Sequence, residues 1–190
     1  MISQRKIEKE KTRLKLLNVA KKEFLKKGVL STNTADIAKK AGIAHGSIFF
    51  HFNTKETLIN EVIETQLKQI TDNLYPLMNE TDVLDKLINV YFLAIEENEK
   101  FFCMMARERP FYNKYLQHQM IYFDSVIRKY FHDAYKNGLE KNEYRTVDIG
   151  TVLDFLFSTI NYYLSHNNLY KINTKRKIII NTFFTLIRSQ

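Results

Sequence analysis

The chain has 190 residues with only five glycines, two prolines and one cysteine, and its net charge at neutral pH is +8. So few turn-forming residues argue against a sheet of many strands, and we expect an all-α fold of about nine helices. Cys103 alone excludes an internal disulfide and a cysteine-based zinc site, and no apolar run nears the length that crosses a bilayer. We therefore expect a cytoplasmic protein with no membrane partner.

The excess of positive over negative charge lies entirely in the first part of the chain. Residues 1–56 hold 13 Lys and Arg against 5 Asp and Glu, whereas residues 57–190 hold 16 of each. A small basic region joined to a neutral remainder is typical of a protein that binds a polyanion at one end. We therefore predict two domains, 1–56 and 57–190.

The N-terminal residues 1–12 are mostly charged and contain too few apolar groups to pack alone. They form either the solvated start of a helix or a basic arm that reaches a phosphate or the minor groove. The arm's candidate side chains are Arg5, Lys6 and Lys9. From residue 13 to residue 27 the apolar positions have helical spacing, and Gly28 supplies a left-handed end to that helix.

Residues 34–58 predict two short helices, a turn between them and the start of a third helix. Asn33 is a candidate N-cap of the first helix. Gly42 follows that helix, where a left-handed conformation is easily adopted by glycine. Asn53 with Glu56 repeats the capping pattern at the third helix. This is the layout of a helix-turn-helix.

The second of these short helices has one apolar face and one unusual exposed face. Ile48 and Phe52, four residues apart, face the core. The other positions carry a glycine, a hydroxyl, imidazoles and a ring, which allow close approach to another backbone: His45, Gly46, Ser47, Phe50 and His51. The third helix opens with Lys55 in its first turn, and helix N-termini attract phosphate.

Many positions between residues 20 and 58 together form a specific pattern: Phe24, Gly28, Thr34, Ile37, Ala38, Ala41, Gly42, Ile43, Gly46, Ile48, His51, Phe52 and 54–58. This pattern resembles the DNA-binding segment of the TetR family of bacterial transcriptional regulators. The resemblance implies an N-terminal three-helix DNA-binding domain and a C-terminal helical domain for ligand binding and dimerisation.

The resemblance also implies a set of DNA contacts. Thr34, Phe49 through its ring, His51 and Lys55 correspond to positions that hold phosphates, and His45, Gly46, Ser47 and Phe50 correspond to positions that face the groove. His45 and His51 also have a purely structural alternative, as hydrogen-bonding groups at helix ends. Two positions depart from the family pattern: Phe49 replaces a tyrosine whose hydroxyl reaches a phosphate, and Ala44 replaces a capping serine. The amides after Ala44 then need water, a 3₁₀ turn or the DNA as acceptor.

Beyond the helix-turn-helix, the third helix continues to just before Pro76, which disfavours helix at the preceding residue. It is either a lever between the domains or a rigid strut. Apolar periodicity predicts further helices over 81–95, 101–106, 113–137, 146–165 and 174–188. Gly138 closes the helix that begins near residue 113.

Two functional surfaces are predicted in the second domain. Methionines and aromatic rings line adaptable cavities, although such a stripe is also ordinary core. The candidate effector pocket comprises Phe101, Met104, Met105, Tyr122, Phe155 and Tyr162. The last two helices are apolar enough to form a self-association face. Its candidate residues are Phe157, Ile160, Ile179, Phe183, Phe184 and Ile187.

These features together predict a homodimeric, ligand-responsive repressor of transcription. Its partners would be a palindromic double-stranded DNA operator, a second copy of the chain and a small-molecule effector that is largely apolar or aromatic. No phosphate loop, nucleophile elbow or H-E-x-x-H motif supports an enzyme, so we expect no catalytic residue, cofactor or metal. The other open alternative is a protein that binds membrane surfaces or nucleic acids through charge alone.

Overall fold

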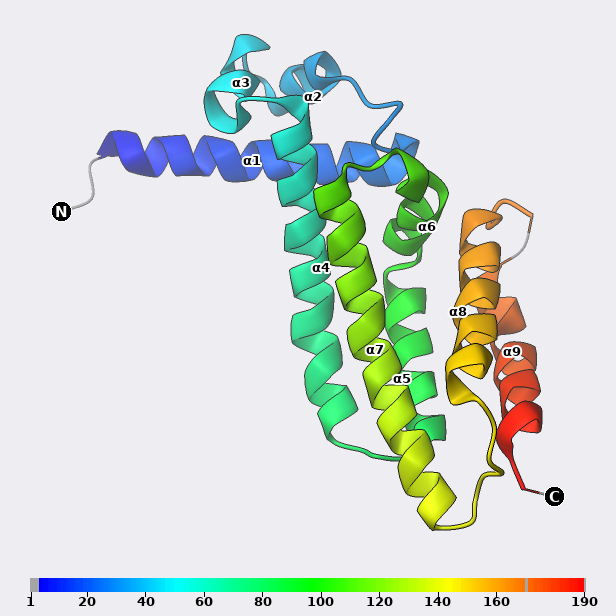
Figure 1. Cartoon of the computed structure of the whole chain (residues 1–190). Helices are drawn as coiled ribbons and strands as arrows, with labels where there is room; N and C mark the ends of the chain where they lie inside the picture. Colours follow the sequence, from blue (N-terminus) through cyan, green and yellow to red (C-terminus); the bar gives the residue numbers. More distant parts are fainter. Residues whose placement is uncertain (1–3, 170, 190) are drawn as a thin grey trace. The chain divides into compact units, whose positions relative to one another are not determined.

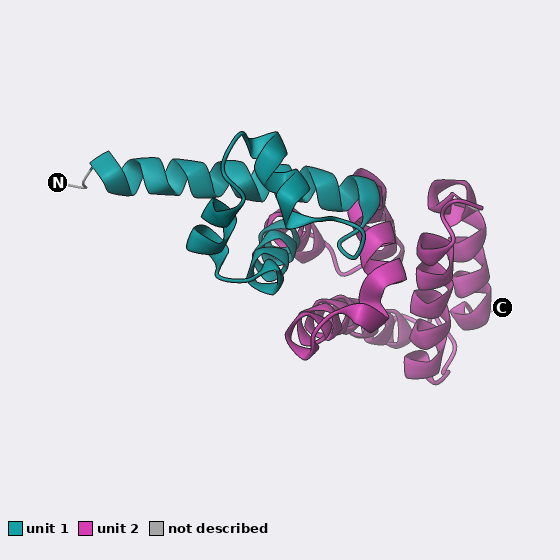
Figure 2. Cartoon of the chain, turned by 90° about the horizontal axis from the view of Figure 1, so that it is seen from above, with its two compact units in different colours: residues 1–68 teal, residues 69–190 magenta. Residues whose placement is uncertain are grey.

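The computed structural model describes residues 4–169 and 171–189. Over these residues it has nine α-helices, one short 3₁₀ helix and one isolated bridge pair, which confirms the predicted all-α fold. The chain groups into two compact units, residues 1–68 (unit 1) and 69–190 (unit 2), coloured separately in Figure 2. The predicted division after residue 56 falls near the start of a long helix, and the compact units divide within that same helix.

Unit 1 contains α1 (Gln4–Lys27), α2 (Thr34–Ala41), α3 (Gly46–Phe52) and the first part of α4 (Lys55–Asn79), as Figure 1 shows. The charged residues 4–12 are the helical start of α1, and residues 1–3 of the possible arm lie outside the described residues. The four helical segments share one small core, whose fully buried side chains include Leu16, Phe24, Ile37, Ile48, Phe52, Leu58 and Ile63.

The ends of the helices in unit 1 follow local side-chain chemistry. Asn33 caps α2 as predicted, because its side-chain oxygen accepts from the Ala35 amide at 2.8 Å. The predicted cap of α4 at Asn53 is wrong. Asn53 has φ 55° and ends α3, so it lacks the extended backbone of an N-cap. Thr54 caps α4 instead, its hydroxyl accepting from the Thr57 amide at 3.0 Å.

Unit 2 is formed by the second part of α4 and by the remaining helices. Their bounds are α5 (Leu84–Glu97), α6 (Glu99–Glu108), η1 (Arg109–Phe111), α7 (Lys114–Glu140), α8 (Ile149–Ser165) and α9 (Ile172–Ile187). Helix α8 contacts α6, α7 and α9, which explains why its sequence is apolar over most of its circumference. Figure 1 shows α5 beside α7 and α8 beside α9.

Two helix ends in unit 2 differ from the sequence prediction. Helix α4 continues through Pro76 to Asn79, because only one backbone bond is lost there and the buried Leu74 and Met78 hold the last turn in place. Helix α7 continues through Gly138 to Glu140. Gly138 is needed for packing instead, since a Cβ at this position would overlap the ring of Tyr144.

The connection between α7 and α8 is tied to the C-terminal end of α9. Tyr144 pairs with Arg188 in the isolated bridge, and the Arg145 amide donates to the Ile187 carbonyl at 2.8 Å. The hydroxyl of Tyr135 on α7 accepts from the Val147 amide at 3.0 Å and donates to the Arg145 carbonyl at 2.8 Å. None of the helices in the described ranges is both long and apolar enough to cross a membrane.

Candidate nucleic-acid interface

The turn between α2 and α3 is built on Gly42. Its φ of 67° is left-handed, as predicted, and the following Ile43 amide donates to the Ala38 carbonyl at 3.1 Å. This pattern ends α2 sharply and satisfies its last carbonyl groups. The chain can therefore begin α3 after only a few residues, with Ile48 buried against the core that α2 also covers.

Helix α3 begins without a side-chain cap, as Ala44 implied. The Ser47 amide donates to the Ala44 carbonyl at 2.9 Å and the Ile48 amide donates to the His45 carbonyl at 3.2 Å. These are bonds to the third preceding residue, so a tight 3₁₀-type turn satisfies the amides. The sequence left water, a 3₁₀ turn or the DNA open as the source of acceptors for these amides, and the structure has the 3₁₀ turn.

The exposed face of α3 carries large apolar side chains. Phe50 is 68% exposed and Phe49 is 41% exposed, whereas Ile48 and Phe52 are buried. A Cβ added at Gly46 would meet nothing within 4 Å. The face is thus open at Gly46, and its rings lie where a second molecule can cover them.

The two histidines of this region have different surroundings. The Nε2 atom of His45 lies 3.0 Å from the hydroxyl of the mostly buried Thr34. His51 Nδ1 is buried without a hydrogen-bond partner among the described residues. Burial lowers the pKa of His51, and the nearby positive charges of Lys9 and Arg13 lower it further. His51 therefore favours its neutral form in the free chain.

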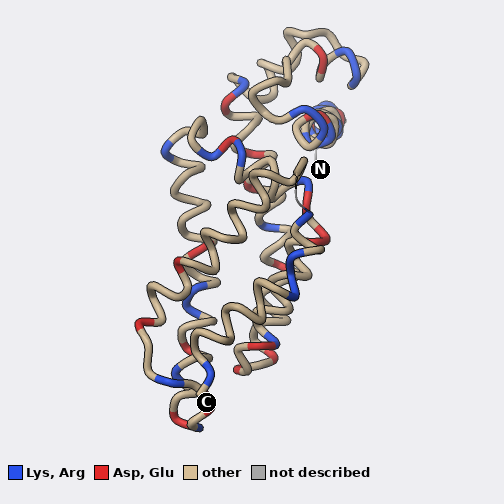
Figure 3. The backbone as a smooth tube through the Cα atoms, turned by 90° about the vertical axis from the view of Figure 1, so that its right-hand side faces the viewer, with Lys and Arg blue, Asp and Glu red and all other residues tan. Residues whose placement is uncertain are grey.

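Basic residues of α1 lie against α3 and α4. The ammonium of Lys9 is 4.6 Å from the centre of the exposed Phe50 ring, and the guanidinium of Arg13 is 5.0 Å from the centre of the Phe52 ring. Arg13 also pairs with Glu61 through both terminal nitrogens. The contact of Lys9 places a cation beside the exposed face of α3. In Figure 3 α1 is seen end-on beside the N-terminus, and many of its positions are coloured as Lys or Arg.

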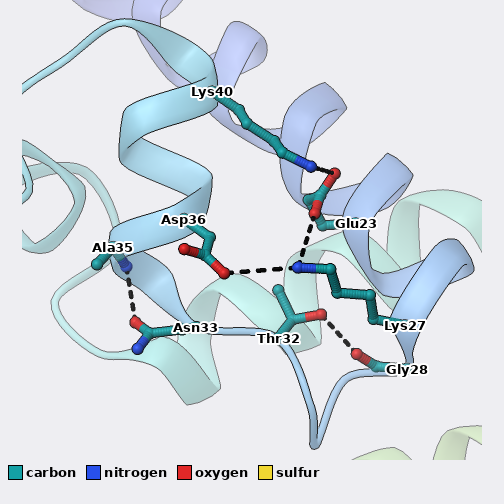
Figure 4. Close-up of polar contacts among 8 residues, drawn as sticks. All are labelled: Glu23, Lys27, Gly28, Thr32, Asn33, Ala35, Asp36 and Lys40. Carbon is teal, nitrogen blue, oxygen red and sulfur yellow. Dashed lines mark hydrogen bonds and ion pairs between the residues drawn. The ribbon is translucent and has the colours of Figure 1, made fainter.

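A buried carboxylate connects α1 to α2 (Figure 4). Glu23 is 5% exposed and binds the ammonium of Lys40, while Lys27 lies 3.7 Å from its other oxygen and 3.5 Å from Asp36. The hydrogen bond from Lys40 lowers the pKa of Glu23. Lys27 and Lys40 therefore brace the fold, and part of the positive charge counted in the sequence has an internal partner.

The start of α4 is a second position for phosphate contact. Lys55 is the first residue of α4 and is half-buried, and Thr54 caps this end. Free amides in a first helical turn carry partial positive charge, to which a lysine adds a full charge. The eight predicted DNA-contacting residues all belong to unit 1, and their individual roles stay predictions.

This region also matches known proteins. The model of a family described as bacterial regulatory proteins, tetR family, matches residues 16–62. The transcriptional regulator TtgR of Pseudomonas putida is 34% identical over 87 residues, which cover 46% of this chain and 41% of TtgR. Residues 16–62 therefore match the DNA-binding segment of the TetR family. The matched segment thus covers less than half the length of this relative.

Similarity to TetR-family proteins also extends beyond the matched segment. The regulator QacR of Staphylococcus aureus is 22% identical over 170 residues, which cover 87% of this chain and 90% of QacR. A solved TetR regulator from Haloarcula marismortui aligns with a TM-score of 0.75 and 14% identity, covering 95% of this chain and 100% of that one. At this identity the structural likeness shows the fold alone.

The predicted effector residues differ in burial, and their role stays a prediction. Phe101, Met104 and Met105 are buried on α6. Tyr122, Phe155 and Tyr162 are each more than half exposed, on α7 and α8. Burial also raises the pKa of Cys103, beside these residues on α6, to about 11. The α6 residues are placed as core, which was the alternative for this stripe.

The predicted dimer residues are all buried within one chain. Each is less than a tenth exposed: Phe157, Ile160, Ile179, Phe183, Phe184 and Ile187. The same two helices expose other residues, which form a shallow groove of about 230 Å³. Its lining includes Phe155, Thr159, Tyr163, Ile178, Thr182 and Leu186. The predicted residues Ile179 and Phe183 also line this groove, below its exposed residues. The contact with a second chain stays a prediction.

Sequence reasoning missed a polar cavity in unit 2. It lies between α7 and α8, and its charged lining residues are Arg109, Asp124 and Arg128. The signal available in the sequence was the spacing of residues 121, 124, 125 and 128, which places them on one face of a helix.

Proposed function

We propose that this chain is a homodimeric, ligand-responsive repressor of the TetR family that binds a palindromic operator and is released from it by a small molecule. The observation that carries the proposal is the exposed face of α3, where Phe50 is uncovered and Gly46 leaves open space. A helix with such a face, placed after a tight turn, suits insertion into the major groove.

Each predicted contact has a chemical role in this proposal. Ser47 hydrogen-bonds a base edge, Phe50 contacts a thymine methyl group, and Gly46 lets the helix backbone approach the groove. His45 touches a base or the backbone. The phosphate contacts come from Thr34, the ring of Phe49, His51 and Lys55. A phosphate beside His51 would favour its protonated form, opposite to the effect of Lys9 and Arg13.

The second copy would cover the exposed groove of α8 and α9. Phe155 and Ile178 are each more than 60% exposed there and have large apolar side chains. Burying such a patch between two copies favours association. A symmetric dimer must hold its two α3 helices about 34–36 Å apart to reach successive major grooves.

Release would follow from a change in that spacing. Helix α4 carries Lys55 at its start and continues into unit 2, so it is the covalent route between the two functions. An effector that binds more tightly to the conformation with the wrong spacing lowers the affinity for the operator.

The proposal is tested by selecting binding sites from a library of random duplex DNA and footprinting the enriched sequences. We expect one palindromic sequence with two protected half-sites. Uniform protection with a steep dependence on salt would instead indicate charge-driven binding to any polyanion and would contradict the proposal.

Two variants then test the contacts on the selected duplex. Lys55→Ala should weaken binding and reduce the slope of log affinity against log salt by about one, because one phosphate contact is lost. Lys136→Ala, an exposed lysine of unit 2, is the matched control and should leave the slope unchanged. Gly46→Val should abolish binding while preserving thermal stability, since its side chain meets nothing in the free chain.

A further inference from the structure

Unit 2 contains a polar cavity of about 360 Å³ that none of the predicted site residues identified. Its size lies within the range of small-molecule sites, about 300–1,000 Å³. Its lining combines charged, hydroxyl, amide and apolar groups from η1, α7 and α8: Arg109, Ile121, Asp124, Ser125, Arg128, Phe157, Ser158 and Asn161.

The wall contributed by α7 is one continuous face of the helix. Its four residues occupy positions i, i+3, i+4 and i+7, which lie above one another on a helix. On an isolated helix this face would be an ordinary solvated stripe. Here α8 contacts α7 and lines the other side with Ser158 and Asn161, so polar groups of two helices border one space that is open to solvent.

Two guanidinium groups and one carboxylate line the cavity, and Arg128 has a second carboxylate partner, Asp154, outside the lining. The closest approach of Arg109 to Asp124 is 3.6 Å, longer than a hydrogen bond, so this ion pair can exchange for a better acceptor. Arg128 is oriented by Asp154 at 2.8 Å and by the Phe157 ring, whose centre is 4.3 Å away.

The cavity is partly shielded from water. Burial raises the pKa of Asp124, while the positive charges of Arg109 and Arg128 oppose that effect. Charge interactions are stronger in such a site than on an open surface, because the local dielectric response is weaker. A guanidinium here therefore discriminates between charged and neutral ligands more strongly than an exposed lysine would.

Phe157 connects the cavity to a cluster of buried rings. Its ring centre lies 5.8 Å from that of Tyr91 and 6.1 Å from that of Phe131. Ile121 adds an apolar group from α7. Phe157 is 3% exposed and is covered by Arg128, so the exposed Ile121 is the apolar surface that the cavity offers to a flat ring beside two planar cations.

We infer that this cavity binds an aromatic carboxylate, whose carboxylate accepts hydrogen bonds from Arg109 and Arg128 while its ring packs against Ile121. Guanidinium groups match a carboxylate with two parallel hydrogen bonds, which selects this anion by shape as well as charge. The inference adds a negative charge to the apolar or aromatic effector expected from the sequence. Only its connection to DNA release rests on the proposed function.

Calorimetric titration of the full chain without DNA tests the inference. Benzoate, benzyl alcohol and benzylamine share one ring and differ in charge. We expect benzoate to bind about tenfold more tightly than benzyl alcohol, and benzylamine to bind more weakly still. No measurable benzoate binding, or equal binding of benzoate and benzyl alcohol, would overturn the inference.

Variants of opposite expected sign separate the site from general charge effects. Arg109→Gln should weaken benzoate binding about tenfold, and Asp124→Asn should tighten it, because a competing carboxylate is removed. The matched controls are Lys129→Gln and Asp133→Asn, which change the same charges in an exposed ion pair of α7 and should have no effect. Equal effects in these controls would contradict the assigned site.

A further variant distinguishes loss of the binding geometry from loss of folding. Arg109→Lys keeps the charge but loses the planar group, so it should bind benzoate less tightly than the parent chain and more tightly than Arg109→Gln. Binding equal to that of the parent chain would contradict the hydrogen-bonded geometry. If benzoate binds as described but leaves operator affinity unchanged, the cavity assignment stands and its role as the effector site in the proposed function fails.

Discussion

Units 1 and 2 both bury an apolar core between helices, but they leave different groups exposed. In unit 1 the exposed rings of Phe49 and Phe50 lie on a short helix, and the ammonium of Lys9 is beside one of them. In unit 2 Phe155 and Ile178 form part of an apolar groove. A ring beside cations suits a polyanion, whereas an apolar groove suits another protein surface. The surroundings of an exposed ring therefore distinguish its partners better than the ring itself.

The strongest test of this comparison introduces the same charged residue at a buried and at an exposed position of α9, in two separate variants. Phe184→Asp should destabilise unit 2 by about 4 kcal/mol or more in urea unfolding, because it removes a buried ring and buries a charge. Ile178→Asp should leave the chain folded by circular dichroism and convert a dimer to a monomer in sedimentation.

Leu93→Asp, a similarly exposed residue of α5, is the control for Ile178→Asp and should leave the dimer intact. If Phe184→Asp remains fully stable and only the dimer is lost, then the assignment of Phe184 to the core of one chain is wrong. That result would support the sequence-based prediction that Phe184 lies in the dimer interface.

A smaller effect is expected from the carboxylate that connects α1 to α2. The pKa of Glu23 is below the ordinary value of 4.5 in the folded chain, so its contribution is complete above that pH and is lost as pH falls through the folded pKa. Glu23→Gln should lower the free energy of unfolding by about 1 kcal/mol at neutral pH. The difference from the parent chain should shrink below pH 4.5.

Glu8→Gln, at an exposed position of the same helix, should show no such pH-dependent difference. A difference for Glu23→Gln that stayed constant down to full protonation would indicate a packing effect of the amide, and the charge interaction with Lys40 would then contribute little.

The smallest effect concerns the hydroxyl that Phe49 lacks. Phe49→Tyr should tighten binding to the selected duplex about fivefold, because a restored hydroxyl donates to a phosphate. Fluorescence anisotropy measures the change. Phe111→Tyr adds the same group at an exposed position of unit 2 and should have no effect. Equal affinity of Phe49→Tyr and the parent chain would mean that this departure from the family pattern has no consequence.

The sequence predicted unit 1 in detail because local chemistry determines it. Asn33 and Gly42 have side-chain or backbone requirements that only a cap and a left-handed turn satisfy, and both occur where expected. The four-residue spacing of Ile48 and Phe52 fixes which side of α3 is buried. The cap of α4 was missed because Asn53 and Thr54 are both capping residues, and only the backbone of Asn53 excludes it.

In unit 2 the helices were predictable and their exposed faces were not. Helices α8 and α9 carry apolar residues on most sides, so periodicity could not separate the buried Phe157 and Phe183 from the exposed Phe155 and Ile178. The cavity was missed for a related reason. Asp124 and Arg128 on one helical face are ordinary for a solvated surface, and only the packing of α8 against α7 places the polar groups of a second helix opposite them.

The bridge between Tyr144 and Arg188 has a mechanical consequence for unit 2. It fastens the connection after α7 to the end of α9, and Gly138 on α7 permits the close fit. A ligand that displaced α7 at the cavity would therefore rotate α7 about the end that is fastened by this bridge. The same bridge would pass the rotation to α9, the helix that carries Ile178.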